Sequence, residues 1–257
     1  MSLPALNKND VNVFLLKDGG ARDLALEAFY YDSITVEEKR KYHKFHFDKD
    51  KRLYLLSHAM LRLLLSHYIG CSSHDISFAY NAYGKPYLLD YPEISFNLSH
   101  SRQAIALVLN QGNNLYLGID VESHQKQGKV IDLALNFFSP KECKLLTKYP
   151  IDIQDKIFFK FWTLKESYIK AIGKGLSIDL NSFAFSSLEK NIDIIHCDSE
   201  EEKKYWQFYQ SEIYQDYFLA LAIRSSQDMV NKLNIQTFEY LPTTNCIEKP
   251  ITYITSA

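Results

Sequence analysis

The sequence predicts an α+β fold built from two similar lobes. Each half of the chain places a long helical segment before a group of strand-like segments. Two apolar runs, QAIALVL (103–109) and YFLALAI (217–223), look alike and occur once in each half. Seven residues in two copies can also agree by chance, so this repeat favours two lobes without establishing them. No stretch rich in proline, glycine or serine divides the chain, and we place the lobes at residues 1–115 and 116–257.

The first half is expected to hold one long helix followed by strands. From about Asp50 to Ile69 apolar side chains recur at helical spacing, and Gly70 is a natural end for such a helix. The preceding segment, residues 34–51, is dense in charge. Runs rich in β-branched and aromatic residues predict strands at 76–80, 94–98, 103–109 and 114–122, with a hairpin connection over 110–114.

The second half repeats this order. A helical region is expected from about Val130 to Tyr149, with Pro140 opening its second part. The longest helix signal runs from about Asp155 to Ile172 and ends at Gly173. Strands are then expected at residues 182–187, 193–197, 205–214 and 217–223.

Composition and charge exclude several classes of protein. The 257 residues are 46% hydrophobic and 23% charged, which is ordinary for a globular protein. A formal net charge of −2 gives no overall attraction to nucleic acid or to an anionic membrane, so an anionic ligand needs a local basic cluster. The most apolar stretch, residues 53–69, contains histidine, arginine and serine, which argues against a membrane span. We therefore expect no nucleic-acid partner and no membrane partner.

The cysteines and the first residues predict a cytoplasmic protein. The chain has no CxxC pair and no common zinc-site spacing, so free thiols in a reducing compartment are expected for its four cysteines, at positions 71, 143, 197 and 246. The opening MSLPALNKNDVNVF lacks the basic segment and long apolar stretch of a signal peptide.

Two carboxylates lie at the end of a predicted strand. Asp120 and Glu122 are two residues apart, so their side chains point to the same side of strand 114–122. Such oxygen ligands suit Mg²⁺, particularly when phosphate oxygens and water complete its octahedron. An isolated Asp-x-Glu is more often a solvated strand end, so the pair alone does not establish a metal site.

The predicted helix 155–172 carries a second candidate pair. Glu166 and Lys170 are four residues apart and therefore neighbours on one helix face. The glutamate could join a metal site or take a proton, and the lysine could meet a phosphate. An exposed, mildly stabilising ion pair is the alternative.

Two short polar segments complete the candidates. Gly84-Lys85-Pro86 follows a turn and restrains a lysine that can address a phosphate. The run FNLSHS (96–101) leads from a strand into serine and histidine side chains that are good donors to phosphate and ribose. A hydrolase is not favoured, because no GxSxG turn is present. Alone, each segment is also typical of an ordinary turn or strand end.

Taken in order, GKP (84–86), FNLSHS (96–101), GIDVE (118–122) and FWTLKESYIKAIGKGL (161–176) resemble the surfactin-synthetase-activating (Sfp-type) 4'-phosphopantetheinyl transferases. The resemblance covers roughly residues 34–223. It implies two similar α+β lobes related by a pseudo-twofold axis, with coenzyme A in the cleft between them. It also implies an active form that is usually a monomer.

The resemblance further implies roles for individual residues. Asp120, Glu122 and Glu166 match the ligands of Mg²⁺, and Lys170 matches the lysine that meets the coenzyme A phosphates. The nucleotide is expected to contact six residues: Gly84, Lys85, Pro86, Asn97, Ser99 and His100. Lys41 and Arg52 resemble the basic residues that grip the 3'-phosphate, although a shift of register is easy in the lysine-rich segment 39–52.

The implied reaction transfers 4'-phosphopantetheine from coenzyme A to a serine of an apo acyl, peptidyl or aryl carrier protein and releases 3',5'-ADP. Asp120, Glu166 and Lys170 are then the expected catalytic residues, with either Glu166 or a metal-bound water as the base. Two other functions stay open on the residues alone. One is a different Mg²⁺-dependent phosphotransferase or phosphodiesterase, and the other is a non-catalytic module that binds coenzyme A or a carrier.

The segment between Gly118 and Phe158 is the expected place for an acidic carrier to dock. It combines basic with apolar side chains, at Lys126, Lys129, Lys141, Lys144 and Lys148 and at Leu133, Phe137, Phe138 and Leu145. An amphipathic helix that packs on its own core is the alternative.

Overall fold

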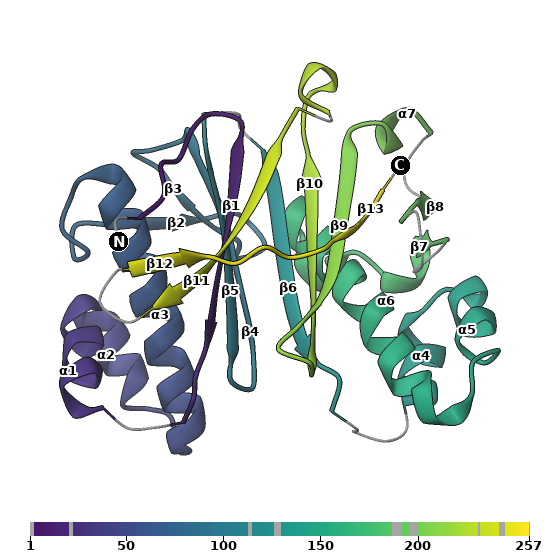
Figure 1. Ribbon diagram of the computed structural model, residues 1–257, viewed down its shortest axis with the longest axis horizontal. Helices are drawn as coiled ribbons and strands as arrows, with labels where there is room; N and C mark the ends of the chain where they lie inside the picture. Colours follow the sequence, from purple (N-terminus) through teal and green to yellow (C-terminus); the bar gives the residue numbers. More distant parts are fainter. Residues whose placement is uncertain are drawn as a thin grey trace.

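Both predicted lobes are present in the computed structural model, each built on an antiparallel arrangement of strands with helices on its outer side (Figure 1). The structure describes residues 3–20, 23–112, 115–125, 130–186, 192–195, 200–230, 232–241 and 245–256. Lys126, Lys129 and Cys197 lie outside these ranges, as does part of the predicted strand 193–197. The predicted hairpin over 110–114 is wrong, because the strands 104–111 and 116–123 on either side of it belong to different sheets.

The N-terminal lobe orders three antiparallel strands as β1 (Asp10–Lys17), β5 (Ala104–Gln111) and β4 (Ile94–Ser101). Alternate side chains of these strands pack against three helices, α1 (Leu24–Ser33), α2 (Val36–Tyr42) and α3 (Asp48–Ile69). A small hairpin, β2 (Phe78–Tyr80) and β3 (Pro86–Leu88), lies between α3 and β4 in sequence.

The C-terminal lobe repeats this connectivity with β6 (Tyr116–Ser123), β10 (Tyr217–Arg224) and β9 (Trp206–Ile213). Its helices are α4 (Val130–Phe137), α5 (Pro140–Leu146) and α6 (Ile151–Ile172). Shorter elements connect α6 to β9, namely η1 (Gly175–Ser177), η2 (Leu180–Ser182), β7 (Ala184–Phe185), β8 (Ile194–Ile195) and α7 (Glu200–Lys203). The two similar runs seen in the sequence are β5 and β10, and each lies between the other two strands of its lobe.

The two long helices, α3 and α6, have the same length and the same end. Each has 22 residues and stops at a glycine in the left-handed conformation, Gly70 at φ 78° and Gly173 at φ 77°. Both ends were predicted, and α6 begins at Ile151, ahead of the expected Asp155. The predicted helical region 130–149 is two helices, because Ser139 caps α5 and Pro140 occupies its first turn.

The lobes pack against each other through the sheet faces that point away from the helices. An apolar core between them contains residues of β1, β5, β6 and β10, among them Val13, Ala106, Ile119, Val121 and Leu221. This core explains why β6 keeps its apolar residues on one face and its carboxylates on the other.

The C-terminal segment connects both lobes. After η3 (Gln227–Met229), strand β11 (Asn234–Leu241) pairs in parallel with β1, and β12 (Asn245–Glu248) pairs with β11. The chain then crosses back, and β13 (Ile254–Thr255) pairs with β9 (Figure 1, yellow). The proposed boundary after residue 115 falls between β5 and β6, yet residues 234–248 return to the N-terminal sheet because the outer edge of β1 is open to them.

Side chains of β4 join the two sheets at the opposite edge. Asn97 Oδ1 accepts the backbone N–H of Ile119 at 2.8 Å, and Ser99 Oγ accepts that of Val121 at 3.3 Å. Ser101 Oγ accepts the N–H of Ser123 at 3.4 Å. Polar residues at every second position of β4 therefore satisfy the edge of β6, and they place the NLSHS segment directly beside the DVE segment.

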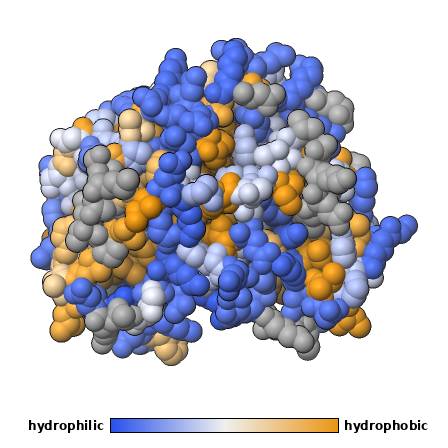
Figure 2. Space-filling view, viewed as in Figure 1, coloured by the Kyte–Doolittle hydropathy of each residue, from blue (hydrophilic) through white to orange (hydrophobic). Residues whose placement is uncertain are grey.

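The surface on the side shown in Figure 2 is mainly hydrophilic, with apolar patches between the charged groups. None of the helices in the described part of the chain has the length and apolar character that crossing a membrane requires. Cys71, Cys143 and Cys246 are free thiols, as predicted for them.

Candidate active site

Asp120 is the centre of the candidate site. It lies on β6, is 2% exposed, and its Oδ1 accepts hydrogen bonds from Lys170 Nζ at 2.6 Å and from Ser99 Oγ at 2.9 Å. Lys170 Nζ also donates to Ser99 Oγ at 2.9 Å. Three residues predicted from three separate motifs thus meet at one carboxylate. Asp120 Oδ2 is buried and accepts no hydrogen bond within the described residues.

Glu122 lies one step further along the same face of β6. Its Oε2 accepts a hydrogen bond from Ser101 Oγ at 2.6 Å. Ser101 was not among the predicted site residues, although the alternation of Asn97, Ser99 and Ser101 along an apolar strand could have indicated it.

Glu166 faces these carboxylates from α6. Burial and the charge of Asp120 raise the pKa of Glu166 to about 7, and burial, Asp120 and Glu166 together raise the pKa of Glu122 to about 7. As the side chains stand, no three acidic, histidine or cysteine side chains of the described ranges converge into a ready-made metal site. A hard cation would relieve the repulsion that raises both pKa values. It would also give the unpaired Asp120 Oδ2 a partner.

Gly118 allows β6 and α6 to approach closely enough for this assembly. A Cβ atom at position 118 would lie less than 3.0 Å from the Ser167 carbonyl oxygen and from the backbone of Ala171. The glycine of the GIDVE motif is therefore required by packing between backbones, a role that the sequence did not reveal.

The GKP segment contacts the C-terminal lobe. Lys85 Nζ donates to the carbonyl oxygens of Leu117 at 2.9 Å and Ala171 at 3.0 Å, and burial lowers its pKa to about 8. Asn81 Nδ2 donates to the Gly173 carbonyl at 2.7 Å. Gly84, at φ 87°, and Pro86 form the turn and the start of β3. Lys85 thus joins the lobes beside the site instead of pointing freely into it.

Lys41 of α2, Tyr54 and His58 of α3, and His100 of β4 form a basic wall beside the carboxylates. His100 is exposed at the end of β4, and its pKa is lowered by partial desolvation, by the nearby Lys170 ammonium and by His58. His58 packs on Tyr54 with ring centroids 4.0 Å apart, and Lys41 Nζ lies 5.4 Å from the centre of the Tyr54 ring. The sequence indicated Lys41 and His100 but missed His58 and Tyr54.

The structure does not bring Arg52 to this wall. Its guanidinium donates to Asp18 at 2.6 and 2.9 Å and also pairs with Glu27. These contacts tie α3 to α1 and to the end of β1, because two carboxylates far away in sequence satisfy the guanidinium.

Among the described residues, the cluster of Asp120, Glu122 and Glu166 has no counterpart at the equivalent positions of the N-terminal lobe. By the pairing of β1 with β5 and of β6 with β10, Phe14 and Leu16 occupy the positions equivalent to Asp120 and Glu122. Counting back from the glycines that end α3 and α6, Leu63 is equivalent to Glu166 and His67 to Lys170. The pseudo-twofold fold therefore carries one carboxylate cluster among its described residues.

Comparison with known proteins identifies the family. Residues 116–222 match the family model "4'-phosphopantetheinyl transferase superfamily", and residues 27–111 match "4'-phosphopantetheinyl transferase, N-terminal". The chain is 31% identical over 210 residues to a 4'-phosphopantetheinyl transferase of Bacillus subtilis, which covers 81% of this chain and 90% of that protein. The chain belongs to the 4'-phosphopantetheinyl transferase family. It moves the 4'-phosphopantetheine group of coenzyme A to carrier proteins.

Other relatives agree with this family. The transferase is 33% identical to the 4'-phosphopantetheinyl transferase Sfp of Bacillus subtilis, across 59% of this chain and 65% of Sfp. It is 31% identical to the human L-aminoadipate-semialdehyde dehydrogenase-phosphopantetheinyl transferase, across 75% of this chain and 67% of that protein. A crystal structure of holo-[acyl-carrier-protein] synthase from Thermotoga maritima matches 42% of this chain and 62% of that one, with 18% identity and a TM-score of 0.36.

We expect the stability of the metal-free transferase to fall as pH rises. The folded protein keeps the protons of Glu122 and Glu166 up to about pH 7, whereas ordinary glutamates lose them near 4.5. The free energy of unfolding should therefore decrease between these values and level off above them. If these carboxylates hold Mg²⁺, the ion should raise Tm more at about pH 8 than at about pH 5.5, because a cation is attracted by the ionised form. Thermal melting at both pH values checks this, and an equal Mg²⁺ effect at both would contradict it.

Proposed function

We propose that Asp120, Glu122 and Glu166 hold Mg²⁺, an ion that this family typically uses. The donor set supports this, because three neighbouring carboxylates and a buried, unpaired oxygen favour a hard divalent cation. When bound, Mg²⁺ would neutralise charge on the pyrophosphate of coenzyme A. The observation that carries the proposal is the meeting of Asp120, Lys170 and Ser99 across the seam between the lobes.

The reaction forms one bond and breaks one. The Oγ of the carrier serine attacks the β-phosphorus of coenzyme A, which bears pantetheine, and the bond from this phosphorus to the bridging oxygen breaks. The leaving group is 3',5'-ADP. Lys170 Nζ, at the edge of the site and 28% exposed, is placed to stabilise negative charge on the leaving side.

Glu166 is the residue we propose as the base for the serine proton. It faces Asp120 and Glu122 from α6, so its carboxylate lies beside the place where the serine would react. Glu122 lies in the same cluster, but the Ser101 hydroxyl already holds its Oε2. Within the described residues no hydrogen bond engages the Glu166 carboxylate, which leaves its oxygens available to the incoming serine.

The nucleotide is proposed to lie along the basic wall, with Gly84, Pro86, Asn97, Ser99 and His100 on its path. Lys85 is proposed to border this path without binding the nucleotide through its ammonium, which the Leu117 and Ala171 carbonyl oxygens already hold. Lys41 is the residue that we propose to bind the 3'-phosphate. Arg52 is not proposed for this role, because Asp18 holds its guanidinium. Wild-type transferase should prefer coenzyme A over 3'-dephospho-coenzyme A by roughly tenfold in kcat/KM, the effect of one charge-assisted contact. Lys41→Ala should lose most of this preference, as measured by steady-state kinetics with both substrates.

Arg52→Met is the informative comparison. Because Arg52 pairs with Asp18 and Glu27, this variant should lower Tm while keeping the preference for the 3'-phosphate. If Lys41→Ala discriminates as well as the wild type, or if Arg52→Met abolishes discrimination, the phosphate is read elsewhere.

A carrier protein is proposed to dock on α4 and α5. Leu133, Leu135 and Phe137 are 44%, 67% and 38% exposed, and apolar atoms are visible over this region at the lower right of Figure 2. Phe138 is buried in the core of the lobe and Leu145 packs against that core, so neither belongs to the surface. Lys141 and Lys144 on α5 and Lys148 just beyond it are all exposed.

Reversing charge on this surface should weaken carrier association. We expect Lys141→Glu/Lys144→Glu to raise the carrier KM about fivefold at low salt and to approach wild-type behaviour at high salt, since charges mainly steer association. The KM for coenzyme A should not change. Lys232→Glu, at an exposed position outside α4 and α5, serves as the control. Equal carrier kinetics at every ionic strength would place the carrier elsewhere.

The transfer itself is tested with coenzyme A, Mg²⁺ and a panel of apo carrier proteins. Mass spectrometry should show the added arm on a carrier serine, and gel filtration should show the monomer that we propose. Nucleotide turnover without a carrier would favour another phosphotransferase. Binding without transfer would favour a non-catalytic module.

A further inference from the structure

Lys165 belongs to the FWTLKES motif but takes no part in the mechanism above. It precedes Glu166 on α6, is fully buried, and points into the C-terminal lobe instead of toward Asp120. Its ammonium donates to the carbonyl oxygens of Leu180 at 2.7 Å and Phe183 at 2.8 Å. It also pairs with Glu142 Oε2 at 2.8 Å.

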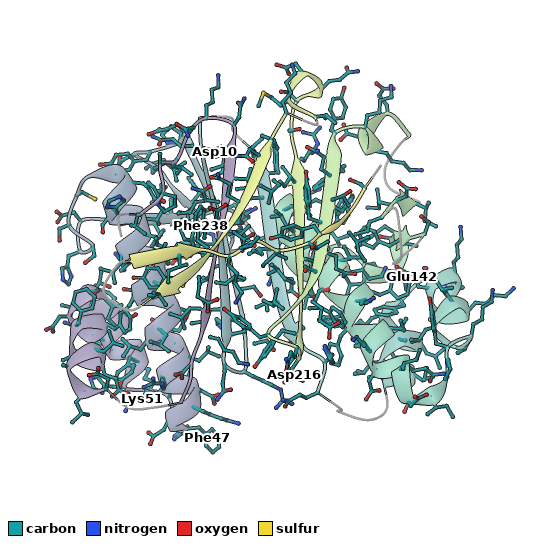
Figure 3. The ribbon with its side chains drawn as sticks, viewed as in Figure 1. Asp10, Phe47, Lys51, Glu142, Asp216 and Phe238 are labelled. Atoms are coloured by element: carbon teal, nitrogen blue, oxygen red, sulfur yellow. The ribbon has the colours of Figure 1, made fainter. Side chains whose placement is uncertain are left out.

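Glu142 is equally buried and fully engaged (Figure 3). It is the third residue of α5, and its Oε2 accepts the N–H and the hydroxyl of Ser139 at 3.0 and 2.9 Å, which closes the capping box of that helix. Its Oε1 accepts the N–H of Phe185 at 3.0 Å. The pair therefore connects α5, α6, η2 and β7 at one point.

The N-terminal lobe contains the same arrangement. Arg62 of α3 is 4% exposed and pairs with Glu38 Oε2 at 2.6 Å, and Glu38 closes the capping box of α2 with Thr35. Arg62 also donates to the carbonyl oxygens of Ser73 at 2.7 Å and Ile76 at 3.0 Å. Arg62 and Lys165 each lie eight residues before the glycine that ends their helix, since 70 − 62 and 173 − 165 are both 8.

Because the same buried ion pair recurs in both lobes, we infer that its role is to orient the helix that carries it. A buried ion pair gains little stability over a well-packed apolar pair, because both charges lose their hydration. The pair instead fixes the orientation of the helix, because an ammonium bound to three fixed acceptors resists rotation of the helix that carries it. Successive helical residues are about 100° apart, so any rotation that moves Lys165 also moves Glu166 relative to Asp120.

We propose that Lys165 is a positioning residue whose pair with Glu142 holds α6 in the rotation that presents Glu166 and Lys170 to Asp120. Arg62 and Glu38 do the same for α3, where Glu38 Oε1 also bonds His58 Nδ1 at 2.9 Å. Because α5 follows α4 directly, the pair also ties the proposed docking helices to the helix of the active site. The inference rests on the proposed metal role of Glu166.

The test removes both charges at once with Lys165→Met/Glu142→Gln, which keeps similar volumes and leaves a carbonyl oxygen for Ser139. We expect Tm to stay within a few degrees of the wild type. Binding of Mn²⁺, measured by calorimetry without coenzyme A or carrier, should weaken about tenfold, as for other groups that orient metal ligands. Amide hydrogen exchange should be faster in the second half of α6. Lys156→Met/Glu212→Gln, which removes an exposed ion pair between α6 and β9, should match the wild type in all three measurements.

A folded double variant with wild-type Mn²⁺ affinity and wild-type exchange would overturn the proposal, because a merely structural role changes Tm alone. If the wild type binds no Mn²⁺, the metal site is refuted, and the exchange of α6 alone decides the positioning role. If the double variant does not fold, Glu142→Gln is measured in the same way. There too, unchanged Mn²⁺ binding and exchange would overturn the proposal.

Discussion

Asp120→Asn is expected to lower kcat of phosphopantetheinyl transfer on the order of a thousandfold, while coenzyme A still binds. Asparagine has the shape of aspartate but lacks the charge that a divalent cation and the Lys170 ammonium require. Both interactions would converge on this side chain, so one substitution removes the proposed metal ligand and the counter-ion of Lys170 together. Single-turnover kinetics with an apo carrier, combined with Mn²⁺ calorimetry, measure the two losses separately.

The same substitution should leave a folded protein with a slightly lower Tm. Removing one charge from a cluster of carboxylates relieves repulsion, which by itself should cost little stability. In the structure Asp120 also accepts hydrogen bonds from Ser99 and Lys170, which the asparagine oxygen can keep only in part. Asp193→Asn, at an exposed aspartate of the same lobe, is the matched control. Near-normal transfer by Asp120→Asn would refute the assignment of the metal site.

Much of the site could be predicted because its side chains lie on regular elements with simple periods. Asp120 and Glu122 share a face of a strand, and Glu166 and Lys170 share a face of a helix, whatever the rest of the fold does. The sequence could not show that Ser99 and Asp120 would touch. That contact requires β4 to lie against β6, and 21 residues separate the two side chains.

The missed features depend on partners that are remote in sequence. Arg52 looked like a phosphate ligand because it lies in a basic segment, but Asp18, 34 residues away, accepts its hydrogen bonds. Strand β11 carries no motif, and its pairing with β1 spans most of the chain. In the sequence Lys165 looks like any helical lysine. Only the structure shows that Glu142 and two carbonyl oxygens surround its ammonium. In each case the structure depends on a partner that is remote in sequence and that satisfies a polar group which would otherwise be left without a hydrogen bond.

The fold itself was predictable at the level of lobes for a related reason. Each lobe repeats one order of strand, helices and two further strands, and both long helices end at a glycine that the sequence displays. Helices α1 and α2 escaped prediction because neither shows a clear apolar stripe. In α1 apolar residues such as Leu24 and Phe29 also lie on the exposed side, and α2 is dense in charge and has no buried residue. The crossing of residues 249–253 between the lobes has no local signal at all.

Gly118→Ala is expected to lower the free energy of unfolding by about 3 kcal/mol, a large loss for the addition of one methyl group. The new Cβ would meet the Ser167 carbonyl oxygen and the Ala171 backbone at less than 3.0 Å, and neither can move without shifting α6. For a chain of this size, we expect Tm to fall by roughly 10 °C.

The activity of the folded fraction of Gly118→Ala should also fall, by about a hundredfold, because moving α6 away from β6 separates Lys170 and Glu166 from Asp120. Gly19→Ala is the matched control, since a Cβ there meets nothing within 4 Å. Thermal melting and single-turnover transfer, normalised to folded protein by circular dichroism, measure both effects. A Gly118→Ala protein with wild-type Tm would show that β6 and α6 are not held at the close approach described here. A lowered Tm with wild-type transfer would show instead that the spacing of these two elements does not set the geometry of the site.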